Sequence, residues 1–152
     1  MSAGLIAGTG RALKRLSNVS REIQGSIAIG SLAYLGETMT NYAKDQGRPG
    51  AWKNQTGNLR ASITWVVLGP NKSQAVPYRT KGQGWKTASV RNQTSMPMMV
   101  VFAGMDYAPY VEFKPGYNVL SGAFERYRPL AKQILGEHMK VTAPKHLKKW
   151  LV

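Results

Sequence analysis

The sequence predicts an α+β domain, and three features carry that prediction. A long run of apolar residues at helical spacing comes first, two apolar strand patterns separated by a polar basic stretch follow, and a second helical pattern comes last. We therefore expect a long N-terminal helix and a C-terminal helix packed on a small, mainly antiparallel β-sheet, with a long basic loop or hairpin. A chain of 152 residues suits one domain, 1–152, whose ends at 1–10 and 140–152 we expect to be flexible or ordered at an interface.

The N-terminal helix is predicted between Arg11 and Tyr42, where apolar residues recur at helical spacing. The pattern is compatible with a break near Ser17-Asn18. Three glycines inside the helix each weaken it by roughly 1 kcal/mol relative to Ala. We expect these glycines to let another element approach closely; they are Gly25, Gly30 and Gly36.

A short helix and a first strand are predicted next. Thr56 or Asn58 can cap the helix, and Leu59 and Ile63 share its inner face. The following residues, 64–68, form a β-branched and apolar run that a Gly-Pro pair stops, which is typical of a strand.

The second strand is predicted at 98–104. It is so apolar that we expect it to be central in a sheet or covered on both faces. Residues 71–95 are polar, basic and contain glycine, so we expect a long loop or an extended hairpin there. Few aliphatic side chains are present whose burial would offset the entropy that the backbone loses on ordering. We therefore expect this segment to be mobile in the monomer until a neighbouring protein supplies contacts.

The C-terminal part is predicted to contain an aromatic-rich turn at 107–113 and a last helix. The helix should begin near Tyr127-Arg128-Pro129, with proline in its first turn. Its inward side chains are expected to be Leu130, Ile134, Leu135 and Met139.

The charge of the chain indicates anionic partners. Lys and Arg total 21 against 7 Asp and Glu, a formal net charge of +14, and no acidic residue lies between Asp45 and Asp106. Such a region attracts polyanions or acidic protein surfaces. Our candidates for polyanion contact are Lys72, Arg79, Lys81, Lys86 and Arg91.

Enzymatic chemistry is not indicated. The chain has no cysteine, and His138 and His146 lack a neighbouring carboxylate pair, so we interpret them as exposed tail residues. Asp106 and Glu112 form the only plausible nearby acid pair. We expect no catalytic residue, no cofactor and no metal site, and the Gly-containing stretch at 81–85 lacks the context of a phosphate loop. No uninterrupted apolar stretch reaches the roughly 18 residues that a membrane span needs, and we expect no membrane contact.

Three motifs carry a family resemblance. The segments TGNLRASI at 56–63 and YAPYVEF at 107–113, followed by a Tyr-Arg-Pro-Leu helix start, resemble the small tail-component proteins of tailed phages. These are tail-completion, neck or head–tail joining proteins, and the resemblance covers about residues 19–135 in the family's order. The chain departs from the family pattern at Lys53-Asn54-Gln55 and at Lys114-Pro115.

The resemblance implies a structural virion protein, assembled in the host cytoplasm. It would form a homo-oligomeric ring at the head–tail junction and contact head-closure, tail-terminator or tail-tube proteins, with at most weak nonspecific DNA contact. The alternative, suggested by charge, is a basic nucleic-acid-binding module.

The candidate subunit interface combines the motif residues with aromatic residues of the basic segment. Glu112 is expected either to cap a helix or to pair with Arg60, and Tyr107 and Phe113 are equally consistent with ordinary core. The predicted interface residues are Leu59, Arg60, Tyr78, Trp85, Tyr107, Tyr110 and Glu112.

Overall fold

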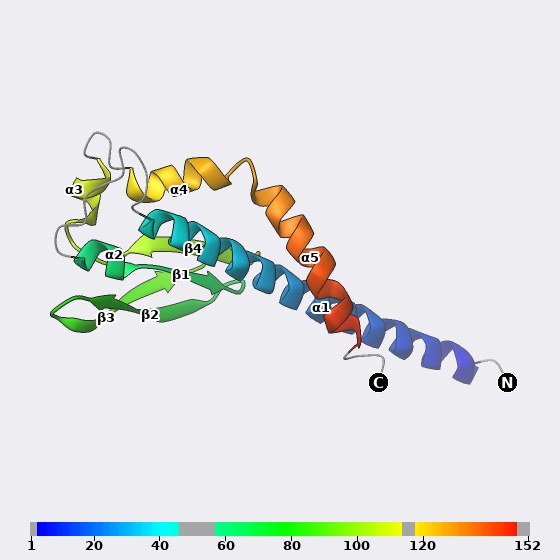
Figure 1. The fold of residues 1–152 in the computed structure, drawn as a ribbon. Helices are drawn as coiled ribbons and strands as arrows, with labels where there is room; N and C mark the ends of the chain where they lie inside the picture. Colours follow the sequence, from blue (N-terminus) through cyan, green and yellow to red (C-terminus); the bar gives the residue numbers. More distant parts are fainter. Residues whose placement is uncertain (1–2, 46–56, 114–117, 149–152) are drawn as a thin grey trace.

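The structure is a computed structural model that describes residues 3–45, 57–113 and 118–148. It has the α+β class that the sequence predicts (Figure 1). Its elements in chain order are α1 (Ala3–Lys44), α2 (Asn58–Ser62), β1 (Ile63–Leu68), β2 (Ser73–Thr80), β3 (Gly84–Arg91), β4 (Met98–Ala103), α3 (Ala108–Glu112), α4 (Val119–Tyr127) and α5 (Ala131–Lys148).

The strands form two antiparallel pairs. β1 pairs with β4, from Ile63 opposite Ala103 to Leu68 opposite Met98, and β2 pairs with β3 as a hairpin. Figure 1 shows the β1–β4 pair between the helices and the hairpin. The predicted antiparallel pairing is confirmed, with the described strands divided into two two-stranded sheets.

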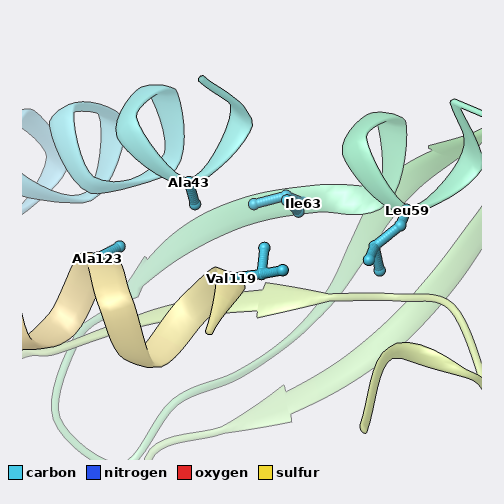
Figure 2. Packing of buried hydrophobic residues seen from close by; sticks show 5 residues of the cluster. All are labelled: Ala43, Leu59, Ile63, Val119 and Ala123. Atoms are coloured by element: carbon cyan, nitrogen blue, oxygen red, sulfur yellow. The ribbon is translucent and has the colours of Figure 1, made fainter. Parts of the chain in front are cut away.

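The β1–β4 pair is covered on both faces. On one face Ile63 belongs to a cluster with Val119 and Ala123 of α4 (Figure 2), and on the other Val66 belongs to a cluster with Val76 of the hairpin. Alternate residues of a strand point to opposite faces, so a continuously apolar strand needs two covering layers. Because β4 contributes to both clusters, the prediction that the second strand is covered on both faces is confirmed.

The long helix α1 packs closely on the sheet at Gly36. A Cβ at this position would lie 3.1 Å from Sδ of Met99 and 3.2 Å from the ring of Trp65. A Cβ at Gly25 or Gly30 would have nothing within 4 Å. The predicted close approach is therefore confirmed at Gly36, and the other two glycines have no such packing reason.

The inner face of the hairpin belongs to the core of the domain. Val76, Tyr78 and Thr80 are buried and alternate with exposed residues of β2. The Tyr78 ring meets Phe102 edge-on, and a Cβ at Gly104 would lie 2.5 Å from that tyrosine ring. The hairpin alternative is confirmed. The expectation that a neighbour must supply its contacts is wrong for this face, because strand alternation gathers its few apolar side chains on one side.

Asn92 holds together the corner where the chain leaves the hairpin for β4. Its side chain is fully buried, and Nδ2 donates hydrogen bonds to the carbonyls of Gly69 (2.9 Å) and Met96 (2.7 Å). Oδ1 accepts from the N–H and the hydroxyl of Thr94 at 2.9 and 2.8 Å. A buried amide with its donors and acceptor satisfied fixes the local backbone. The sequence pattern gives no prediction for Asn92, because its partners are set by the fold of this corner.

The helices differ from their predicted extents. α1 begins at Ala3 and has no break at Ser17-Asn18, because a helix once nucleated extends cooperatively through adjoining residues. α4 precedes α5 as a separate helix that the sequence analysis missed, and α5 continues to Lys148. Leu130 and Met139, predicted to point inward, are exposed: Leu130 lies in the turn before α5, and Met139 lies on α5, which packs mainly against one element, α1.

The N-terminal part of α1 extends past α5 and away from both sheets (Figure 1). With 42 residues the helix is about 63 Å long at 1.5 Å per residue. The N-terminal part of this helix therefore projects beyond the layers of the domain.

The same substitution at two glycines of α1 should have different effects on stability. We expect Gly30→Ala to raise the free energy of unfolding by roughly 0.5–1 kcal/mol, because it improves helix propensity in open space. Gly36→Ala should be less stable than Gly30→Ala by about 1–3 kcal/mol, because its methyl group presses on Trp65 and Met99. Urea unfolding of both variants measures the difference, and equal stabilities would contradict the close packing of α1 on the sheet.

Candidate partner-binding surfaces

The short helix α3 carries two exposed aromatic side chains. Pro109 lies in its first turn, where a missing N–H costs no helical hydrogen bond. Ala108 and Val111 pack against the core, whereas Tyr110 and Phe113 are 81% and 85% exposed. Both pairs have i, i+3 spacing, so one face of the helix is anchored and the opposite face presents the aromatic rings. We call Tyr110 and Phe113 the α3 patch.

An apolar cavity lies beside this patch. Its volume is about 370 Å³, and α2, β4, α3 and α4 contribute its walls. Leu59, Phe102 and Leu120 line it together with Phe113. Large exposed aromatic residues next to an apolar hollow are typical of a surface that binds another protein.

Glu112 fixes α3 to the N-terminus of α4. Its Oε2 accepts a hydrogen bond from the N–H of Leu120 at 2.8 Å, and its Oε1 accepts one from the N–H of Ser121 at 2.6 Å. Asn118 occupies the N-cap position of α4 but makes no side-chain capping bond. Glu112 therefore supplies the cap from another helix, and its negative charge also suits the positive end of the helix dipole. Of the two roles predicted for Glu112, the structure shows the cap.

The electrostatics of Glu112 follow from this arrangement. Burial raises the pKa of the carboxyl group, but hydrogen bonds from the Ser121 hydroxyl and from the backbone N–H groups of Leu120, Ser121 and Val119 lower it by more. The net pKa is below the ordinary glutamate value. The carboxylate is thus held in the charged form that the cap requires.

The hairpin presents a second surface on its outer face. Arg79 of β2 is directly opposite Trp85 of β3, and Ser73 is opposite Arg91, which places these four side chains on the same face. Trp85 is 71% exposed. The candidate polyanion contacts are all exposed on or beside the hairpin; they are Lys72, Arg79, Lys81, Lys86 and Arg91.

A hollow of about 470 Å³ adjoins the hairpin tip. Arg79 and Lys81 line it on the hairpin side, and Gly57 and Ala61 line it on the side of α2. The cavity walls thus combine two cations with small residues, which leaves room for an anionic group.

The predicted interface residues lie in three different environments. Leu59 and Tyr78 are buried within the chain, so neither presents a surface to a neighbour. Arg60 is exposed on α2, near Lys44, whose pKa is lowered first by burial and then by the Arg60 charge. Trp85 lies on the hairpin surface with its ring exposed.

The motif aromatics and the hairpin tip lie at one end of the molecule. Figure 1 places α3 and the tip there with α2 between them. Tyr107 is at the N-cap of α3 and partly exposed. The core interpretation of Phe113 is wrong, and the i, i+3 spacing from Tyr110 is the sequence signal that relates the two rings.

The interpretation of His138 as an exposed tail residue is also wrong. The ring is half-buried, stacks on Tyr34 with 4.8 Å between ring centroids, and places Nδ1 3.1 Å from Oγ of Ser31. It therefore fastens α5 to α1. The side chain of His146 lies outside the described part. Among the described residues, no group of three or more His, Asp or Glu side chains is placed to hold a metal ion.

Comparison with protein-family models, with curated proteins and with solved structures finds no match for this chain. Within the residues that the structure describes, no helix has the length and hydropathy needed to cross a membrane.

Replacing Glu112 by Gln should destabilise the domain at neutral pH, by about 0.5–2 kcal/mol, the usual range for a lost helix cap. The pKa of Glu112 is lowered in the folded state, so its stabilisation is present above the unfolded carboxyl pKa of about 4.3 and is lost as the pH falls through the folded value. The difference between wild type and Glu112→Gln should therefore shrink in acid. Chemical unfolding from pH 7 to pH 3 measures it.

Glu125→Gln is the matched control, because Glu125 is an exposed acid on α4 itself. It should change the free energy of unfolding by less than about 0.5 kcal/mol at any pH in this range. A pH-independent deficit in Glu112→Gln would contradict a role for its charge.

Proposed function

We propose that this chain is a structural protein of a tailed-phage virion, a subunit of a ring at the head–tail junction that joins head and tail by protein–protein contacts. The observation that carries the proposal is the α3 patch, which belongs to one of the motifs that resemble the tail-component family. Tyr110 and Phe113 stay exposed in a chain that buries smaller apolar residues elsewhere.

The energetics of the α3 patch favour a protein contact. Full burial of an aromatic side chain contributes about 1.5–3 kcal/mol, so the two rings together would contribute roughly 3–6 kcal/mol to an interface. The backbone of α3 that carries the rings is also held in place before binding, because Glu112 caps α4 and the opposite face of α3 packs on the core. A preorganised contact surface loses little entropy on association.

The shape of the chain is consistent with a ring. The α3 patch lies at one end of the molecule, and the free N-terminal part of α1 lies at the other (Figure 1). A ring needs a heterologous interface, in which two different surfaces of neighbouring subunits meet. The α3 patch and the projecting end of α1 lie at opposite ends and supply that geometry, and the length of α1 lets it reach past the body of its own subunit.

Charge introduced into the α3 patch should abolish joining without unfolding the subunit. We expect the double variant Tyr110→Asp, Phe113→Asp to keep its unfolding free energy within about 0.5 kcal/mol, because both side chains are exposed. Joined, infectious particles should fall at least about tenfold, because two anchors of the contact are lost. Plaque counts and electron microscopy of lysates complemented with each variant measure this.

Met96→Asp is the matched control, since Met96 is 70% exposed in the loop between β3 and β4, away from the α3 patch. It should support normal joining. If the double variant joins heads to tails as wild type does, the proposed role of the patch is refuted.

A nucleic-acid-binding module is the second candidate function. The exposed cations of the hairpin beside Trp85 favour it, because cations can follow a phosphate backbone while an aromatic ring stacks on any base. We rank it second because the hairpin presents a single exposed aromatic ring, whereas a binding groove for single strands uses several.

Salt dependence separates the two functions. A dedicated binder with six or more phosphate contacts loses about a thousandfold or more in affinity between 50 and 200 mM salt. We expect this chain to bind DNA weakly and without sequence preference at the lower salt concentration. Tight, salt-steep binding that disappears when Arg79, Lys81 and Lys86 are neutralised would favour the nucleic-acid function instead; fluorescence anisotropy with labelled DNA is the measurement.

A further inference from the structure

Strand β3 has one edge without a partner strand among the residues that the structure describes. It pairs with β2 alone, and from Gly84 to Thr87 every residue is exposed. An unpaired strand edge presents a row of backbone N–H and C=O groups that can pair with another chain. The other strand of the hairpin has Pro77, which lacks an N–H, whereas β3 contains no proline.

The register shows which backbone groups of β3 face this open edge. The N–H of Asn92 donates to the carbonyl of Lys72 at 2.8 Å, so these opposite residues form a hydrogen-bonded pair at the base of the hairpin. Hydrogen-bonded and non-hydrogen-bonded pairs alternate along an antiparallel ladder. Pro77 and Thr87 are opposite each other and lie five positions along the ladder from that pair. Because five is an odd number, they form a non-hydrogen-bonded pair.

The position of Pro77 agrees with this assignment, because a proline costs no ladder bond at such a site. On β3 the groups that point outward are therefore those of the odd-numbered residues, Trp85, Thr87, Ser89 and Arg91.

The charge around this edge specifies the partner. Lys81 at the tip, Lys86 and Arg91 on β3 and Arg79 opposite Trp85 are all exposed, and no acidic residue occurs between Asp45 and Asp106. A second copy of the same edge would bring equal positive charges together. An extended segment rich in Asp and Glu would instead place carboxylates beside these cations.

We propose that the open edge of β3 binds an extended acidic segment of another protein by strand addition. The outward backbone groups at Trp85, Thr87 and Ser89 hydrogen-bond to the segment, and Arg79, Lys81, Lys86 and Arg91 contact its carboxylates. A nucleic acid is less suitable for this site, because the sugar–phosphate backbone cannot complete a β-ladder.

This inference rests on the proposed function only in that the chain works through contacts with other proteins. It concerns the hairpin and not the α3 patch. It is tested on the isolated full chain, so its failure would leave the joining experiment on the α3 patch unaffected.

Thr87→Pro is the decisive variant. It removes an N–H that faces the open edge and makes no bond to β2, in the same way as Pro77 on the opposite strand. The probe is a fluorescent synthetic peptide of alternating glutamate and valine, titrated into the full chain at low salt. We expect saturable binding to wild type and at least about tenfold weaker binding to Thr87→Pro. Thr87→Val keeps the N–H and should bind as wild type does.

A modified peptide controls for unfolding of the hairpin. The same peptide N-methylated at alternate residues keeps its charge but cannot pair along one of its edges. It should bind wild-type chain at least about tenfold more weakly when the methylated edge is the one that meets β3. Methylation of the other edge should have no effect. The proposal would be overturned if all peptides bound equally. It would also be overturned if oligo(dT) bound more tightly than the peptide and Thr87→Pro left that binding unchanged. A dimer of the free chain that Thr87→Pro dissociates would overturn it as well.

Discussion

The structure depends on one constraint, which is that the β1–β4 pair is apolar on both faces and must be covered twice. The helices α1, α3 and α4, which we call the helical layer, cover one face, where Gly36 lets α1 lie directly on Trp65 and Met99. The hairpin covers the other face, where Tyr78 packs edge-on against Phe102 and lies over Gly104. A two-stranded ribbon is marginal in water by itself, and these two layers provide the burial that it lacks. Each layer then has an outer surface that is not needed for folding, and those outer surfaces carry the candidate sites.

The α3 patch is an outer surface of the helical layer. Glu112 is the link, because one carboxylate satisfies two backbone donors at the start of α4 and so fixes the helix that precedes it. The lowered pKa of this group means that the link keeps its charge further into acid than an ordinary glutamate does. With α3 fixed, Tyr110 and Phe113 face solvent in a defined geometry. In the motif that resembles the tail-component proteins, Glu112 thus has a structural role, and the two aromatic rings are exposed to solvent.

The hairpin divides its residues in a similar way. Its even-numbered β2 residues from Val76 to Thr80 point inward and are buried, and its odd-numbered residues, Arg79 and Arg91 among them, point outward. Basic residues remain at the solvent because burying an unpaired charge is far more costly than burying Val or Tyr. Charged residues are also a common guard on exposed strand edges. The same cations that protect β3 from pairing with its own copies make it selective for an acidic partner.

The sequence by itself determined the class of the fold, the two central strands and the acid-free basic segment, because these follow from residue type and local periodicity. Burial on both faces of β4 could be predicted for the same reason, since a strand without polar alternation leaves no face for water. The environment of Tyr78 could not be predicted, because its burial depends on Phe102 and Gly104, which lie more than twenty positions along the chain. The same holds for His138, whose contacts with Ser31 and Tyr34 join α5 to α1, more than a hundred positions apart in the sequence.

The separation of Phe113 from the core was likewise decided by tertiary structure, since the packing of Ala108 and Val111 selects which face of α3 turns outward. The identity of a side chain sets whether burial or exposure is favourable for it. Contacts between segments distant in sequence decide which residues are buried and which stay exposed.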